Sequence, residues 1–155
     1  MWRAALGRAL AWNEAHATFD KAVDGWPPAL RGRRPDNFPH SAWELVEHLR
    51  IAQHDLLDFS VNAGYEEKQW PRDYWPPDPA PPDAAAWDES VARYRADRDA
   101  LRKLVEDPSV DLAARIPHGD GQTYLRELLL AIDHAAYHVG QLVAVRRVLG
   151  AWSGA

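Results

Sequence analysis

The sequence predicts an all-α protein, an up-and-down four-helix bundle that forms a single domain over residues 1–155. Four segments repeat apolar residues at spacings of three and four, which is the period of an amphipathic helix. No strand-like alternation of apolar and polar residues stands out beside these periods. Two long connectors, at residues 25–40 and 61–82, join the helices, and the chain is long enough for one core.

The first expected helix covers about residues 2–24. Gly25 follows it, and then Trp-Pro-Pro, a combination that ends helices because proline cannot continue one. The stripe that would face the core recurs at spacings of four and three residues and consists of Ala5, Ala9, Trp12, His16, Phe19 and Val23.

The second expected helix covers about residues 41–62. Ser41 is a suitable N-cap, and Glu44, three residues later, completes a capping box. An apolar stripe from Leu45 to Phe59 follows. We therefore expect this helix to begin at a well-defined position.

The third and fourth expected helices cover about residues 84–106 and 122–149. The third ends at Asp107 because the next residue is a proline, which disfavours helix in the residue before it. The fourth is closed by Gly150. Its apolar residues lie on nearly all sides, which is typical of a helix that is buried against several neighbours.

The connector at residues 61–82 contains the segment QWPRDYWPPDPAPPD, in which Trp70 and Trp75 lie among prolines. Aromatic rings left in water lose the free energy of burial, so we expect these side chains to cover apolar surface. The favoured interpretation is a loop packed over the bundle, and the alternative is a lid over a pocket. Loops of this length are often functional.

Composition excludes several classes of protein. The chain has no cysteine, which excludes disulfides, thiolate ligands and a cysteine nucleophile. Its net charge is −5 with acidic and basic residues interspersed, which argues against a nucleic-acid-binding protein. No signal-peptide pattern and no long apolar run is visible, so we expect no membrane association and a cytoplasmic location.

Two histidines, His134 and His138, lie four residues apart in the fourth helix. Side chains at this spacing project in nearly the same direction and can hold one divalent ion. A third ligand from another helix would leave positions open for water or substrate. His48 lies about −60° from Leu45 on the second helix, at the edge of its core-facing side, whereas His54 lies at about 180° and faces away.

The spacing of the histidines does not by itself distinguish a metal site from core histidines. His16 lies in the stripe of the first helix, where the favoured interpretation is a core histidine held by a hydrogen bond. The alternative for His16 is an acid or base that lines a pocket. His40 and His118 lie in connectors and are interpreted as structural or pocket-edge residues.

The segments WELVEHLR around His48 and DHAAYHVGQLVAVRRVLGAW around His134 and His138 resemble the DinB/YfiT-like superfamily of metal-dependent enzymes. The resemblance covers nearly the whole chain. It implies an up-and-down four-helix bundle, often a homodimer, and a divalent metal, usually zinc or nickel, held by these three histidines. Some relatives are transferases or isomerases that use a low-molecular-weight thiol.

The function expected first is therefore a metal-dependent transferase or hydrolase that acts on a small-molecule substrate. The ion would activate water or a low-molecular-weight thiol. Glu47, Tyr137, Gln141 and His16 are the candidates for orienting ligands or substrate, and Glu127 is expected behind the ligands rather than among them. One alternative is a metal-dependent sensor or stress-response binding module without catalysis. The other is a structural helical dimer with buried neutral histidines.

Overall fold

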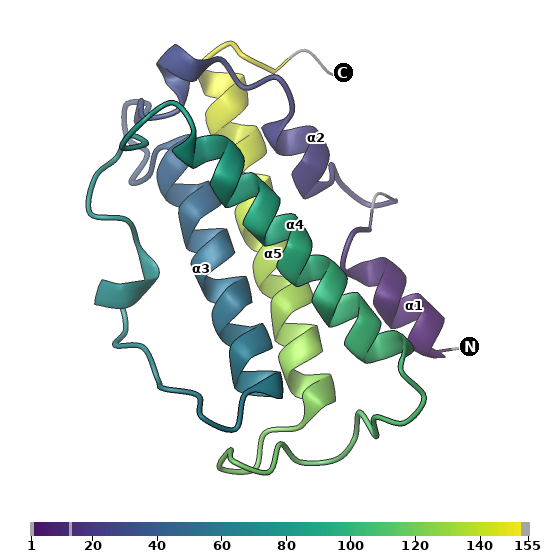
Figure 1. Ribbon diagram of the computed structural model, residues 1–155. Coiled ribbons are helices and arrows are strands. Elements are labelled where there is room, and N and C mark those ends of the chain that lie inside the picture. Colours follow the sequence, from purple (N-terminus) through teal and green to yellow (C-terminus); the bar gives the residue numbers. More distant parts are fainter. Residues whose placement is uncertain (1, 13, 153–155) are drawn as a thin grey trace.

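The described part of the protein, residues 2–12 and 14–152 of a computed structural model, is a bundle of helices (Figure 1). Three long helices form its body: α3 (Ala42–Val61), α4 (Ala86–Glu106) and α5 (Tyr124–Val148). Two short helices, α1 (Trp2–Ala9) and α2 (Phe19–Val23), complete it. Strands are absent from the described residues, so the predicted all-α bundle is confirmed.

The expected single helix over residues 2–24 is wrong. The chain leaves the helix after Ala9 and enters a second helix at Phe19. Thr18 begins that second helix, because its hydroxyl oxygen accepts a hydrogen bond from the backbone N–H of Lys21 over 3.1 Å. Side by side in Figure 1, α1 packs against α4 and α2 against α5.

Each of the two short helices buries its own apolar side chains, which is why the helix breaks. Leu6 and Leu10 join the cluster that contains Leu101 of α4. Phe19 joins a different cluster, with its ring centroid 4.0 Å from that of Tyr94. The break allows both groups to reach the core, where the large side chains gain more free energy from burial than the alanines of the expected stripe.

The start of α3 is confirmed. The hydroxyl of Ser41 accepts a hydrogen bond from the backbone N–H of Glu44, and the Glu44 carboxylate accepts one from the backbone N–H of Ser41. Arg34 adds an ion pair to the same carboxylate. These contacts satisfy the free N–H groups of the first turn and fix the rotation of α3 about its axis.

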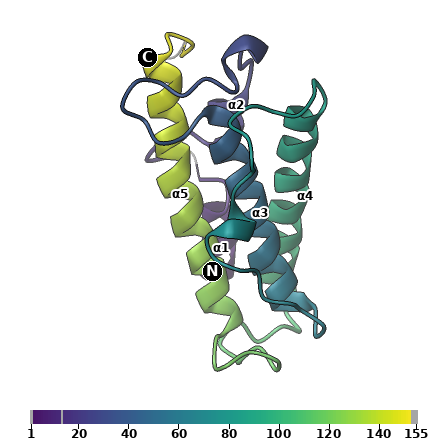
Figure 2. The ribbon, with the colours of Figure 1, turned by 90° about the vertical axis from the view of Figure 1, so that its left-hand side faces the viewer.

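Helix α5 lies against α3 and runs antiparallel to it (Figures 1 and 2). Its cap is Thr123, whose hydroxyl accepts from the backbone N–H of Arg126, so the helix begins two residues later than expected. By length and composition alone α5 could span a membrane. It packs against α2 and α3, and 33% of its most apolar window is buried in the bundle.

The connector between α3 and α4 runs along the outside of α3 and contains a short 3-10 helix, η2 (Arg72–Tyr74) (Figure 2). Trp75 is partly buried and packs against the core, as expected for a ring that covers apolar surface. Trp70 instead stays 67% exposed. This connector covers the side of the bundle where His48 lies, because Tyr74 and Trp75 both contact that histidine.

Candidate metal centre

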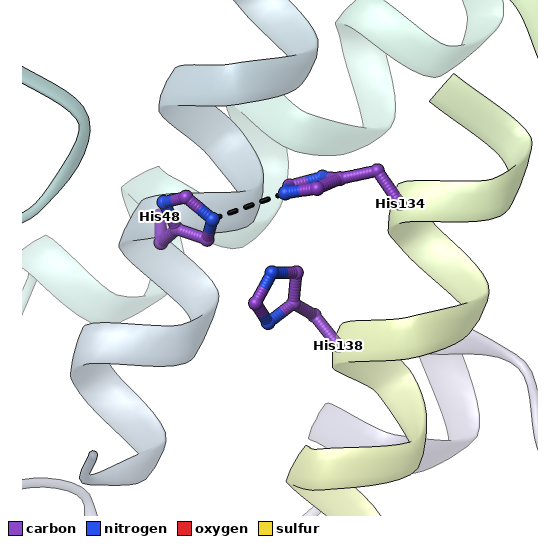
Figure 3. A group of neighbouring side chains, drawn as sticks. All are labelled: His48, His134 and His138. Carbon is purple, nitrogen blue, oxygen red and sulfur yellow. Dashed lines mark hydrogen bonds between the residues drawn. The ribbon is translucent and has the colours of Figure 1, made fainter. Parts of the chain in front are cut away.

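Three histidines from two helices converge between α3 and α5 (Figure 3). His48 comes from α3, and His134 and His138 come from successive turns of α5. One ring nitrogen of each lies within 4.8 Å of the other two. The Nε2 atoms of His48 and His134 are 3.0 Å apart. The structure thus brings together the three side chains that the sequence selects.

Hydrogen bonds fix the proton positions on two of these rings. The Nδ1 of His48 lies 2.8 Å from the backbone carbonyl oxygen of Tyr74, and a carbonyl can only accept. The Nδ1 of His138 lies 2.7 Å from the side-chain oxygen of Gln141. In both neutral rings Nδ1 therefore carries the proton, and Nε2 keeps a lone pair that can bind a metal.

Burial keeps all three rings neutral. Desolvation lowers the pKa of His134 to about 4, with a smaller contribution from His48. Desolvation also lowers the pKa of His138 to about 4, and the two neighbouring imidazoles add to the effect. The pKa of His48 is lowered for the same primary reason. Neutral imidazole is the form that coordinates a cation, so the set suits a divalent metal.

Aromatic rings pack against His48. The ring of Trp75 is stacked on it, with centroids 3.9 Å apart and planes inclined by 2°. His40 stacks in turn on Trp75 at 4.1 Å. This stack and the Tyr74 carbonyl both come from segments outside the long helices, and together they restrict the orientation of the His48 ring.

A cavity of about 510 Å³ lies beside His48 and His134. Its walls come from one side of α3, one side of α5, the connector that carries Trp70, and the loop around residues 118–122. His118 lies at its edge and donates a hydrogen bond from Nε2 to the carbonyl oxygen of Phe59, 2.7 Å away. The cavity gives a small molecule room next to the histidines.

The other residues expected to orient ligands or substrate lie at different distances from the three histidines. Gln141 contacts His138 directly, as described above. The ring of Tyr137 lies edge-on to His138 at 4.9 Å but is 64% exposed. Glu47 forms an ion pair with Arg50 at 2.6 Å and does not line the cavity. Their proposed roles stay predictions.

His16 does not lie in a helix that faces the core, which is the position its spacing predicts. It is exposed, in the segment between α1 and α2, with Nδ1 2.8 Å from the carbonyl oxygen of Ala17. The expected position inside a helical stripe is wrong because the helix breaks before it. His16 belongs neither to the three-histidine group nor to the cavity beside it.

Two parts of the site were missed from the sequence. The Tyr74 carbonyl leaves no trace in a residue pattern, because every residue carries one. Asp55 lines the cavity and follows His48 by seven residues, a spacing that keeps two side chains on one face of a helix. Glu127, named only as a residue behind the ligands, precedes His134 by the same interval. The helical period could have predicted both carboxylates.

The family model of the DinB superfamily matches residues 11–142, which is most of the chain. The chain belongs to the DinB superfamily. None of the curated proteins and none of the solved structures matches it. Its histidine cluster suits the metal association of that superfamily, and the predicted family assignment is confirmed.

Proposed function

We propose that this DinB superfamily protein is a metal-dependent enzyme that acts on a small molecule with the help of water or a low-molecular-weight thiol. A divalent ion, zinc or nickel, would be held by His48, His134 and His138. The observation that supports the proposal most is the convergence of three neutral imidazoles beside a cavity.

The donor set fits such an ion. Two of the three rings already direct an unprotonated Nε2 into the group, because their Nδ1 protons are donated elsewhere. Three histidine nitrogens with no thiolate suit zinc, nickel, copper or iron, and zinc and nickel are the ions that the resemblance suggests. When bound, the ion would lower the pKa of a coordinated water or thiol toward neutrality and so supply a nucleophile.

The chain's own residues have three tasks in this proposal. Tyr74 and Gln141 hold the proton-bearing sides of two imidazoles and so keep their free nitrogens aimed at one point. Trp75 covers one face of His48 and excludes water there. The cavity beside His48 and His134 admits the substrate.

An enzyme fits the geometry better than a closed sensor site. Among the described residues, no fourth histidine or carboxylate joins the three-histidine group. Three protein ligands leave positions for exchangeable molecules, which is the usual arrangement of catalytic rather than structural sites. A sensor with a sealed ion would need a further ligand from the protein.

A homodimer and a cytoplasmic location also remain proposals. Helix α5 exposes several large apolar side chains, namely Leu129, Leu130, Tyr137 and Val148. Apolar side chains on the outside of a bundle can be covered by a second copy. Light scattering on the purified protein would determine the number of subunits.

Metal analysis followed by cobalt substitution tests the proposed function. We expect close to one equivalent of metal per chain, and a rise in melting temperature when zinc or nickel is added to chelated protein. The visible spectrum of the cobalt form should change when a small thiol is added, because positions on the ion are exchangeable. The proposal would be overturned if the purified protein contained no metal and added zinc or nickel did not raise its melting temperature. A cobalt spectrum indifferent to every added ligand would favour the sensor.

A further inference from the structure

Two buried carboxylates line the cavity, each seven residues along its helix from a histidine. Asp55 lies seven residues after His48 on α3, and Glu127 lies seven residues before His134 on α5. Seven residues are two helical turns, about 10 Å along the axis. Because α3 and α5 are antiparallel neighbours, both carboxylates lie toward the same end of the bundle.

The carboxylate of Glu127 is only partly satisfied. The residue is 1% exposed, and its Oε1 accepts a hydrogen bond from Arg126 over 2.8 Å. No hydrogen-bond partner for its Oε2 occurs among the described residues. Glu127 lines the cavity, and its Oε2 is not one of the side-chain atoms that are both sealed off and without a partner. This oxygen can therefore accept a hydrogen bond from a ligand that brings an N–H group.

A second acceptor at the same cavity also has no donor. The side-chain oxygen of Gln122 is buried and has no hydrogen-bond partner within the described structure. Asp55 differs, because it accepts hydrogen bonds from the hydroxyls of Tyr65 and Tyr74 and has Lys68 3.7 Å away. Asp55 is thus held rigidly in the wall, and the free acceptors lie on the α5 side.

The charges that line the cavity also favour a ligand with a positive charge. Four carboxylates line the cavity, those of Asp55, Glu67, Asp120 and Glu127. Two cations oppose them, Arg126 in the lining and Lys68 beside Asp55. Four aromatic rings share the walls with them, those of Phe59, Tyr65, Trp70 and Tyr74. Aromatic faces attract cations, and carboxylates attract them more strongly. An anionic ligand would meet repulsion on most sides.

We propose that the cavity binds the ammonium group of an amine-bearing substrate between Asp55 and Glu127, about two helical turns from the three histidines. The reacting group of that substrate would lie at the histidines, a part of the inference that rests on the proposed function. The substrate class is therefore a primary amine that carries its reactive group about 10 Å from the nitrogen.

Matched alkyl probes test the cationic end of the cavity. The zinc-loaded protein is titrated with an alkylammonium and with an alkylcarboxylate of equal chain length, and the titrations are repeated after chelation. We expect the ammonium to bind at least about tenfold more tightly, as charge-assisted hydrogen bonds predict. Equal binding, or tighter binding of the carboxylate, would overturn the inference.

Three conservative variants locate the effect. Glu127→Gln and Asp55→Asn should each weaken alkylammonium binding by about tenfold, while the exposed Glu89→Gln on α4 should leave it unchanged. Circular dichroism and melting temperature establish that each variant is folded. If one of the two carboxylate variants does not fold, the alkylammonium affinity of the other is the test. Unchanged affinity in a folded variant contradicts the assignment.

Arg126→Ala gives a test in the opposite direction. Its side chain is largely exposed, so the bundle should tolerate the change. Removal of the guanidinium frees the Glu127 carboxylate, and alkylammonium binding should become tighter. If the cavity instead binds anions through Arg126, the variant will lose alkylcarboxylate binding and gain nothing for the ammonium, which would overturn the inference.

A bifunctional pair of probes separates this inference from the proposed function. An aminoalkanethiol and a mercaptoalkanoic acid of equal length are compared on the cobalt-substituted protein. If both thiols change the spectrum at equal concentration, the metal site stands and the amine preference fails. If the protein holds no metal but still prefers alkylammonium, the proposed function fails and the cationic subsite stands.

Discussion

Histidines that the helical period predicts to face the core occur on two sides of the bundle. Among the described residues, only those on the α3–α5 side form a cluster. On the α3–α5 side, His48 and His134 meet with their Nε2 atoms 3.0 Å apart. On the side formed by α1 and α2, His16 is exposed and contacts only the neighbouring Ala17 carbonyl among the hydrogen bonds of the described chain. The difference is the continuity of the helix that carries each residue.

Angular positions on a helix are meaningful only as far as the helix extends. In α3 a capping box fixes the start, and 20 residues continue without interruption. In the first segment the helix stops after 8 residues, because its two apolar groups reach different clusters of the core. Within α3 or α5, a spacing of four or seven residues therefore predicts that two side chains point in a common direction. Between α1 and α2 the helix is interrupted, so the same spacing predicts no common direction.

The strongest test of this comparison removes one imidazole from each side. His134→Ala should lose stoichiometric metal, with affinity reduced by more than about a hundredfold, because a ligand is lost and not merely its support. His16→Ala should keep full metal content. Elemental analysis after gel filtration measures both. Metal loss in the His16 variant, or retention in the His134 variant, would reverse the assignment of the two sides.

The second test concerns stability on the α1–α2 side. Phe19 is 5% exposed and packs on Tyr94, so Phe19→Ala should lower the free energy of unfolding by about 3 kcal/mol or more. Metal affinity should stay unchanged, since Phe19 does not touch the histidine group. Urea denaturation and zinc titration make the two measurements. A parallel loss of metal binding would show that the two sides are coupled.

A smaller loss of metal affinity is expected when a residue that orients a metal-binding histidine is removed. Gln141→Ala removes the acceptor for the Nδ1 proton of His138 and should weaken metal binding by about tenfold, the lower end for residues that orient a ligand. Arg147→Ala, exposed on the same helix, is the matched control. Competition with a coloured chelator gives the affinities. Identical values for the two variants would remove Gln141 from the site.

The smallest expected effect is a pH dependence of the metal-free protein. The folded pKa of His134 and of His138 is about 4, below the ordinary value of 6.5. Between these values the unfolded chain binds more protons, so stability is complete above about pH 6.5 and falls as the pH drops toward 4. Since solvent screens part of the shift, each histidine should contribute on the order of 1 kcal/mol.

Denaturation of chelated protein across that pH range measures the effect. His134→Gln should show a shallower fall than the unmodified protein, because one of the two groups with a lowered pKa is absent. Arg147→Gln, at the surface of α5, serves as the control and should fall as steeply as the unmodified protein. An equally steep fall in the His134 variant would assign the acid sensitivity to other groups.

Much of the fold follows from local patterns. The limits of α3 agree closely with the capping box at Ser41 and Glu44, and those of α4 and α5 lie within about two residues of expectation, the usual uncertainty of helix ends. The failure lies in residues 10–18. The apolar residues of this segment continue the helical period, but Trp12 is 49% exposed and the described residues between α1 and α2 are not helical. Propensity and period could not predict that break, since tertiary contacts decide it.

The sequence by itself determined the three long helices, the family and the three histidines, because these depend on residue type and on spacing within single segments. Only the tertiary structure decided that the Tyr74 carbonyl holds His48, that Trp75 stacks on it, and that Asp55 and Glu127 share one cavity. Those contacts join segments distant in the chain. Their geometry depends on how antiparallel helices and a long connector pack, and no local period encodes that packing.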